Sequence, residues 1–379
     1  MILAPSEAGS EASLGTTAKS SSALAEKGSK ATRALRYQAQ SEARHILRSD
    51  ARKAFPDKYA GDVYRTADCR YVNHGDVGVR LSPQYFSAHY AGLVTCGSVW
   101  ACPVCASRIQ ERRRLEIEQA ISWADSEGLT CVLVTLTFPH RAWHRLADLI
   151  AQQRQAFKRF RSGRAWMKVK PVALIRSLEV THGSNGWHPH THELWFCEQG
   201  SVPSHGRLTE LWQASCVKTG LLDAADDAQV AAFAIHAVDI KRDMTSGDYL
   251  AKQDDSRSWG FSHEVSKATS KSGRKKGVHP HHFLVRKAPR DSEHFLEYVQ
   301  AMKGARQLFW SPGFKARVGL EDLDDVTVAD ESRESADLLA LLTPEQWALV
   351  RGNDARAELL DVAESQGLPG IESFLNSIS

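Results

Sequence analysis

The sequence predicts an α+β protein built around an antiparallel sheet with helices packed on one face. Three observations lead to this prediction. Short β-rich runs alternate with helical stretches through the middle of the chain, and a glycine-rich turn joins two of these runs. The sequence contains no internal repeat. At 379 residues, the chain is long enough for one large core or two modest cores.

The first third of the chain is expected to hold helices and loops. Residues 1–35 are rich in Ser, Ala and Gly and lack an apolar signal core, so we expect an unstructured tail. Residues 36–127 should form an N-terminal region that ends in a helix over 106–127, which Gly128 stops. The other elements predicted there are a charged helix over 36–60 and strands over 77–81 and 85–93.

The elements of the sheet follow in residues 128–319. Residues 131–138 (CVLVTLTF) are a β-rich run closed by Pro139, which predicts a buried strand. Residues 172–181 and 188–196 are two more strands, and the turn that begins at Gly183 pairs them as a hairpin. The remaining elements predicted here are helices over 146–160 and 204–219, a strand over 233–240, a short helix from Asp248 and a basic loop over 266–277.

Charge is divided unevenly along the chain. Residues 320–379 carry 14 acidic and 3 basic residues, which leaves 45 basic and 31 acidic residues in the part before them. A basic body suits a polyanion such as DNA, although two solvated faces of opposite sign would give the same counts. The acidic region is predicted to hold a helical pair, over 336–350 and 354–366. It could recruit a host helicase or polymerase, or serve only as a solvated cap.

No run of the sequence approaches the ~20 apolar residues that span a bilayer. Together with the absence of a signal core, this predicts a cytoplasmic protein without a membrane partner.

Cysteine spacing indicates a structural metal site. Cys96, Cys102 and Cys105 fall within ten residues, and the CPxC turn is a common zinc half-site. Cys69 is the best candidate for the fourth ligand of Zn²⁺, and His74 is the second. The alternative is a set of reduced, buried thiols. A disulfide framework does not fit, because seven cysteines are an odd number in a chain without a secretion signal.

A second metal site is indicated by alternating histidines. His188, His190 and His192 would share one face of a strand, with successive Cβ atoms roughly 6–7 Å apart. Glu179 on the partner strand would face them. Two imidazoles and a carboxylate can hold a divalent cation and leave positions open for a phosphate. The alternative is a row of exposed histidines without a metal ion.

Two other metal motifs do not fit these histidines. The zinc-protease motif HExxH fails because Phe196 stands where the second histidine is needed. A zinc deaminase needs its cysteine pair after the histidine, whereas the cysteine cluster comes first in this chain.

Three segments together resemble one family. The segment HPHTHELWF resembles the paired-histidine motif of the HUH endonuclease superfamily, and VLVTLTF resembles the first motif of plasmid rolling-circle initiators. The segment GDYLAKQ resembles their third motif, and the order of the three motifs also fits. The chain is therefore similar, over about residues 65–290, to the replication initiator (Rep) proteins that carry a cysteine cluster upstream.

The resemblance implies an HUH nuclease-like fold and assigns the metal ligands. Family register selects His190 and His192, with Glu179, as ligands of a catalytic Mg²⁺ or Mn²⁺. Thr191 departs from the bulkier residue that usually stands between the two histidines. His188 is left as a spare ligand or a DNA contact.

The resemblance also assigns the nucleophile. Tyr249 and Lys252 share a face of the predicted helix, and a cation nearby favours the phenolate of a hydroxyl whose pKa is otherwise about 10. Tyr249 would attack origin DNA to form a 5′-phosphotyrosine, and the released 3′-hydroxyl would prime replication. A second transfer would close the circle. Thr245 stands where some relatives carry a glutamate, so the group that acts in termination stays open.

Contacts with DNA are expected at phosphates, because no segment suggests a code for reading bases. Trp187 could stack on unpaired bases near the nick or pack in the core. The cluster His279-Pro-His281-His282 lacks a facing carboxylate and is interpreted as phosphate-contacting or structural. The candidate phosphate contacts are Lys267, Lys271, Arg274, Lys275, Lys276, Arg154 and Lys158.

The leading hypothesis is thus a plasmid replication initiator that nicks and rejoins single-stranded origin DNA. An HUH transposase or relaxase would share the chemistry, but a relaxase often has its tyrosine before the histidines, and Tyr249 follows them. A zinc-stabilised DNA-binding repressor without catalysis is the alternative from another class. It predicts that removal of Tyr249 leaves function intact.

Overall fold

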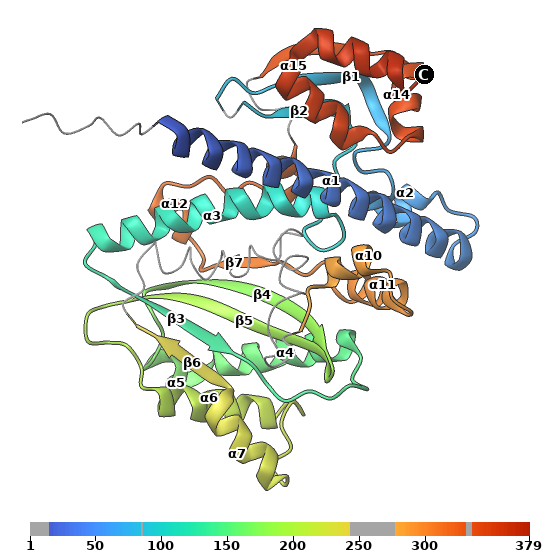
Figure 1. The fold of residues 1–379 in the computed structure, drawn as a ribbon. Helices are drawn as coiled ribbons and strands as arrows, with labels where there is room; N and C mark the ends of the chain where they lie inside the picture. Colours follow the sequence, from blue (N-terminus) through green and yellow to red (C-terminus); the bar gives the residue numbers. More distant parts are fainter. Residues whose placement is uncertain (1–14, 85, 243–276, 331–335) are drawn as a thin grey trace, which may run out of the picture.

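The computed structural model describes residues 15–84, 86–242, 277–330 and 336–379 (Figure 1). It is an α+β protein in which every strand pairing is antiparallel, as the sequence predicted. The described strands form one sheet of five strands and one of three. No helix among the described residues is long and apolar enough to cross a membrane.

The five-stranded sheet has the strand order β6-β3-β5-β4-β7. Its central hairpin joins β4 to β5 and closes at the pair Gly183–Gly186, which confirms the predicted hairpin. One row of directly paired residues crosses the whole sheet, from Leu308 on β7 to Asp239 on β6. The strands are β3 (Thr130–Leu136), β4 (Ala173–Gly183), β5 (Gly186–Cys197), β6 (Val238–Lys241) and β7 (Leu308–Trp310).

Helices cover both faces of this sheet (Figure 1), so the expectation of helices on one face is wrong. On one face, α4 (Leu146–Phe160) and α6 (His205–Val217) pack against side chains such as Trp195. The other face packs against α3 (Pro103–Ser126) and α12 (Phe314–Val318). The reason is visible in β5, whose last four residues, Leu-Trp-Phe-Cys, are all buried. A continuous apolar run needs cover on both sides.

The three-stranded sheet joins the two ends of the chain. Its order is β2-β1-β8, so β8 (Asp337–Leu342) from the C-terminal region pairs with β1 (Asn73–Leu81), which also pairs with β2 (Ala88–Leu93). The predicted helix over 336–350 is therefore wrong in its first part. The run DLLALL gains backbone partners only from β1, which lies more than 250 residues earlier. The C-terminal helices are α14 (Pro344–Gly352) and α15 (Arg356–Ser377).

Two further expectations need correction. Helix α1 (Gly15–Ala54) begins within the predicted tail, because this stretch is rich in Ala and lacks Pro, and Arg33 holds it to Asp361 and Glu364 on α15. In the predicted strand over 233–240, residues 233–236 form the end of a helix and only residues 238–240 are strand. The Asp226 carboxylate caps α7 (Asp227–His236) by accepting a hydrogen bond from Gln229 N–H, and only the short β6 follows.

The other helical elements are short. They are α2 (Ala60–Val63), η1 (Arg65–Ala67), α5 (Gly163–Met167), η2 (Pro280–His282), α10 (Phe283–Arg286), α11 (Asp291–Ala301) and α13 (Asp325–Ala329).

Candidate functional site

The sheet brings a carboxylate and two histidines to one point. Glu179 on β4 pairs directly with His190 on β5, and His192 pairs with Ser177 on β4 and Thr135 on β3. The Glu179 Oε2 atom lies 3.3 Å from His190 Nε2 and 3.5 Å from His192 Nε2. All three ligand atoms lie within 4.8 Å of one another, on partly exposed side chains. This group, the histidine–glutamate triad, lies on the sheet face that α3 and α12 partly cover.

Neighbouring groups orient the two imidazoles. His190 Nδ1 donates to the His188 carbonyl at 3.2 Å, which fixes the ring with its Nε2 atom facing Glu179. His192 Nδ1 is held by the Thr135 hydroxyl at 3.0 Å. Burial acts to raise the pKa of the Glu179 carboxyl, but hydrogen bonds from both imidazoles hold this pKa well below its usual range. Two imidazoles and an ionised carboxylate form a donor set that suits a divalent cation.

His188 lies beside the triad, outside the group of three ligand atoms. Its Nε2 is 2.7 Å from the Thr137 hydroxyl, and its ring stacks between those of His140 and His190. Burial, helped by repulsion from His190, lowers the pKa of His188 to about 3, so the ring is neutral near pH 7. A neutral ring packed on both sides positions His190.

The four predicted cysteines also converge. Cys69 follows η1, Cys96 follows β2, and Cys102 and Cys105 begin α3. Their sulfurs lie within 4.8 Å of one another, and all four side chains are buried and free of disulfides. The closest pairs are 3.5 Å, for Cys69 with Cys105, and 3.7 Å, for Cys96 with Cys105 and for Cys102 with Cys69. The second candidate ligand, His74, is exposed on β1 and is not among them.

The surroundings of the cysteines favour a thiolate at one of the four positions, while hydrogen bonds and burial raise the pKa values of Cys69 and Cys102 well above the usual value. Backbone N–H groups of Cys96 and Ser98 donate to the sulfurs of Cys69 and Cys96, at 3.3 and 3.4 Å. Hydrogen bonds from the other three thiols lower the pKa of Cys105 well below its usual value. A zinc–sulfur bond of about 2.3 Å places the sulfurs of a tetrahedral site about 3.8 Å apart, close to the spacing observed.

Several predicted residues fall elsewhere. Arg154 and Lys158 are exposed on α4, which packs on the sheet face opposite the triad. Trp187 is only 3% exposed and stacks on Tyr298, so it packs in the core and cannot stack on bases. His281 is buried and donates from Nε2 to the Trp100 carbonyl at 2.7 Å, which is a structural role. Tyr249, Lys252, Lys267, Lys271, Arg274, Lys275 and Lys276 lie outside the described residues.

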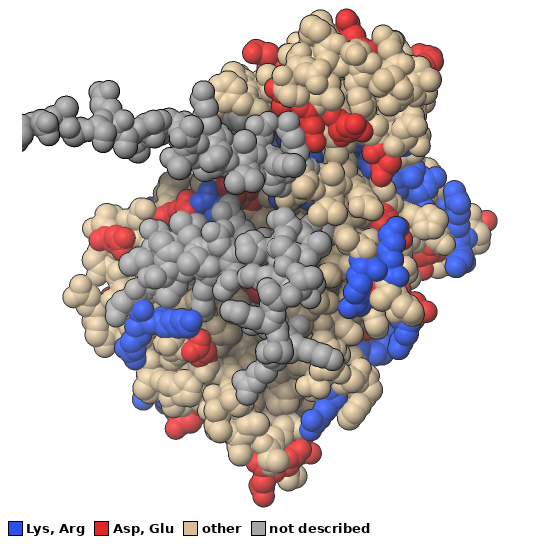
Figure 2. Space-filling model, viewed as in Figure 1, with Lys and Arg blue, Asp and Glu red and all other residues tan. Residues whose placement is uncertain are grey.

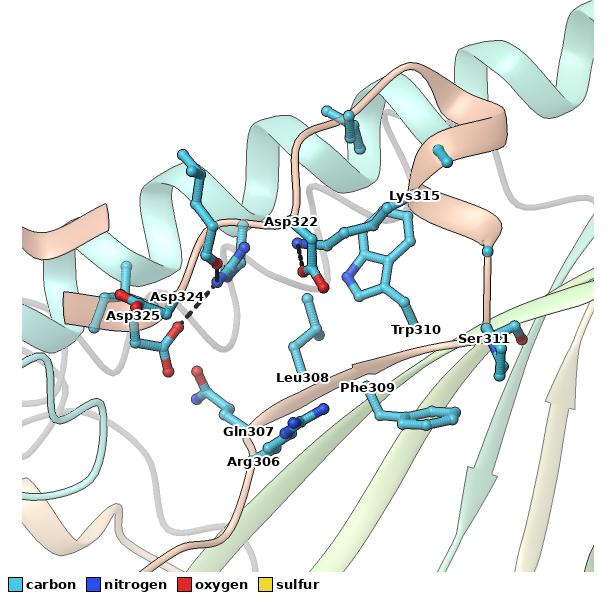
Figure 3. A pocket seen from close by; sticks show the side chains of 17 residues that line it. Arg306, Gln307, Leu308, Phe309, Trp310, Ser311, Lys315, Asp322, Asp324 and Asp325 are labelled. Carbon is cyan, nitrogen blue, oxygen red and sulfur yellow. Dashed lines mark hydrogen bonds and ion pairs between the residues drawn. The ribbon is translucent and has the colours of Figure 1, made fainter. Parts of the chain in front are cut away.

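A cavity of about 790 Å³ on the same sheet face was not predicted. It lies between β7, α3 and α12, with Trp310 and Lys315 among its lining residues (Figure 3). Lys315 is paired with Asp322 at 3.1 Å. Leu308, which lines the cavity, pairs with Ser177 on β4, and Ser177 pairs with His192 on β5. The cavity therefore lies beside β4, the strand that carries Glu179, and one strand further from the two histidines.

The fold and these sites define a class of protein. It is an α+β protein whose antiparallel sheet presents two histidines and a glutamate and which also contains a buried cluster of four cysteines. The chain belongs to the Replication protein family, whose model matches residues 91–347. The match includes the triad, β7 and most of the cysteine cluster.

Two curated relatives come from Streptomyces. Protein rep of Streptomyces lividans is 25% identical over 356 residues, which cover 73% of this chain and 76% of that protein. The Neomycin resistance protein of Streptomyces cyanogenus is 32% identical over 150 residues, which cover 31% of this chain and 34% of that protein. No solved structure matches the chain significantly.

Proposed function

We propose that the protein is a plasmid replication initiator, a metal-dependent, site-specific DNA endonuclease and strand transferase with an HUH nuclease-like fold. It would nick and rejoin origin DNA to start rolling-circle replication. The observation that carries this proposal is the convergence of Glu179, His190 and His192 on one face of an antiparallel sheet. Membership of the Replication protein family and similarity to a protein named Protein rep support it.

The triad fits Mg²⁺ or Mn²⁺. Glu179 offers a hard oxygen, the two imidazoles offer nitrogens, and three protein ligands leave positions for a phosphate oxygen. A divalent cation held by these three residues would stabilise the charge that develops on the scissile phosphate. The residues around it fix the donor atoms. The His188 carbonyl sets the tautomer of His190, and the Thr135 hydroxyl orients His192.

Tyr249 is the proposed nucleophile. Its oxygen bonds to phosphorus as the bond from phosphorus to the 3′ oxygen breaks, and the phenolic proton is balanced by the proton that the 3′ oxygen gains. The products are a 5′-phosphotyrosine and a free 3′-hydroxyl, which primes synthesis. Attack by a 3′-hydroxyl on the phosphotyrosine reverses the step and rejoins the strand. Lys252 would lower the pKa of the tyrosine hydroxyl.

The four cysteines are the proposed ligands of a structural Zn²⁺. Four buried sulfurs near tetrahedral spacing support this assignment. The ion would tie the segments after η1 and β2 to the start of α3, the helix that packs on the triad face of the sheet. The zinc-binding cysteine cluster, predicted from the sequence as a small zinc-binding subdomain, would thus hold α3 in place and take no part in the chemistry.

DNA is the proposed partner, namely the plasmid origin in single-stranded form at the nick. The basic loop with Lys267, Lys271, Arg274, Lys275 and Lys276 would contact phosphates. A host helicase and a host polymerase are proposed as further partners, which would act at the nick after it has formed.

The test is a covalent adduct assay. Protein is mixed with a pool of random single-stranded DNA and Mg²⁺ or Mn²⁺, and a species that survives boiling but collapses with nuclease is sought. Wild type and the control Tyr59→Phe, at a half-exposed tyrosine, should form the adduct, and Tyr249→Phe should not.

The other outcomes separate the alternatives. An adduct that persists in Tyr249→Phe would move the nucleophile to another tyrosine. Tight binding of origin DNA without an adduct in any metal would favour the non-catalytic repressor.

A further inference from the structure

The loop between β3 and α4 presents one tryptophan to solvent. Trp143 is 77% exposed, whereas the indoles of Trp195, Trp212 and Trp347 are at most 2% exposed. A large aromatic ring is normally stabilised by burial, so its exposure to water points to a binding role.

The loop is held in a fixed conformation. His140 Nδ1 donates to the Asn185 carbonyl at 3.0 Å, which ties the loop to the turn between β4 and β5. Arg141 and His144 exchange two hydrogen bonds, from Arg141 N–H to the ring at 3.2 Å and from His144 N–H to the Arg141 carbonyl at 3.1 Å. Trp143 packs edge-on against the His144 ring. An exposed ring that is fixed in advance loses little entropy when it binds a ligand.

A row of stacked rings joins this loop to the triad. His140 stacks on His188 with centroids 4.8 Å apart, and His188 stacks on His190 with centroids 4.7 Å apart. His190 is one of the proposed metal ligands. The loop therefore borders the point where the scissile phosphate would lie.

Two arginines of the same loop flank Trp143 in the sequence. Arg141 and Arg145 are exposed on either side of it, and among the described residues no ion pair involves either guanidinium. The loop also contacts α11, because Leu146 N–H donates to the Glu297 carboxylate at 3.0 Å. Figure 2 shows Lys and Arg side chains, with Asp and Glu among them, on the side of the molecule that carries α10 and α11.

We propose that residues 139–145 form a binding platform for single-stranded DNA next to the scissile phosphate. Trp143 stacks on an unpaired base, and Arg141 and Arg145 contact the phosphates beside it. Stacking needs an unpaired base, because the ring faces of bases in duplex DNA are covered by their neighbours. The proposal rests on the proposed function, which places single-stranded DNA at the nick. An apolar protein partner fits less well, because the exposed ring is bordered by cations rather than by an apolar patch.

The test measures binding of a fluorescent single strand of about 12 random nucleotides, without added divalent cation. Trp143→Ala should raise the Kd between about 5-fold and about 150-fold, and Trp143→Phe should keep most of the affinity. The matched control is Phe86→Ala, since Phe86 is also 77% exposed but lies beside the other sheet. Its affinity should equal that of wild type.

Salt dependence separates stacking from phosphate contact. The double variant Arg141→Gln with Arg145→Gln should reduce the slope of log K against log salt by about 1.4, since each phosphate contact on a single strand contributes about 0.7. Trp143→Ala should weaken binding at every salt concentration and leave the slope unchanged. Circular dichroism should show the same fold in all variants.

Wild-type affinity in Trp143→Ala would overturn the platform. An equal loss of affinity for a duplex of the same sequence would overturn it as well, because stacking on unpaired bases would not explain that loss. The adduct assay on the same preparations tests the proposed function separately. If wild type forms the adduct and Trp143→Ala binds normally, the platform is wrong and the nicking proposal stands. If Trp143→Ala loses single-strand binding and no adduct forms, the platform stands and the nicking proposal fails.

Discussion

Glu179 on β4 lies directly opposite His190 on β5, with its Oε2 atom 3.3 Å from His190 Nε2. Direct pairing in an antiparallel sheet fixes both side chains on one face at short range. His192 joins them from two residues along the same strand, because side chains on a strand alternate. The triad therefore depends on backbone register rather than on a flexible loop, and a one-residue slip of the hairpin would turn His190 and His192 to the other face.

We expect Glu179→Gln to weaken Mn²⁺ binding by at least about 10-fold, as measured by calorimetry. The amide keeps the size of the side chain but lacks the negative charge that attracts the cation. The fold should persist, because Glu179 is partly exposed at the open part of the sheet face. Formation of the DNA adduct should fall with metal affinity.

The control for this variant is Glu198→Gln, because Glu198 is exposed just after β5 and lies outside the triad. It should bind Mn²⁺ as wild type does. Unchanged Mn²⁺ affinity in Glu179→Gln would remove Glu179 from the ligand set.

Those parts of the site that depend on neighbouring residues in the sequence could be predicted from the sequence. Residues 131–138, 172–181 and 188–196 each carry a β-rich run, and the glycine-rich turn sets the hairpin register that pairs Glu179 with His190. The helix over residues 146–160 was predicted with the bounds that the structure has, because its apolar positions repeat at helical spacing.

The parts that were missed depend on contacts distant in sequence. β7 has only three residues, and its pairing with β4 joins positions more than 130 residues apart, so the cavity beside it had no local signal. The pairing of β8 with β1 is equally remote. Trp143 and Trp187 are both close to turns in the sequence, and only the packing of Trp187 on Tyr298 shows which of them is buried.

We expect one zinc ion for each chain, and loss of it in Cys102→Ser. Metal content would be measured by mass spectrometry, and the melting temperature should fall by on the order of 10 °C, because structural zinc binding contributes to folding free energy. Cys216→Ser is the control, since Cys216 is equally buried and outside the cluster. Full zinc content in Cys102→Ser, or none in wild type, would contradict the assignment.

Acid should lower the free energy of unfolding, because His182 is held in its neutral form in the folded protein. Burial next to Trp187 and Phe283, with repulsion from His294, lowers the pKa of His182 to about 4. The unfolded chain takes up this proton at a pKa of about 6.5, so the free energy of unfolding should fall as the pH drops from about 6.5 to about 4. Urea titrations should show a shallower fall in His182→Phe.

The control for the pH experiment is His45→Gln, because His45 is exposed on α1 and should not change the pH dependence. An identical pH dependence in His182→Phe and wild type would show that other groups determine the acid response.

Gly186 should tolerate alanine less well than Gly128, although both adopt a left-handed backbone, with φ of 77° and 68°. An added Cβ at Gly186 would lie 2.9 Å from the Ala142 Cα, whereas at Gly128 it would meet no atom within 4 Å. Both variants carry the backbone strain of about 1–2 kcal/mol, but Gly186→Ala must also push back the loop that holds Trp143, which adds about 1–3 kcal/mol. Urea unfolding of the two variants measures the difference. Equal losses of stability in Gly186→Ala and Gly128→Ala would show that the loop moves away from the new methyl group at no cost in free energy. Single-strand binding by Gly186→Ala should then match that of wild type.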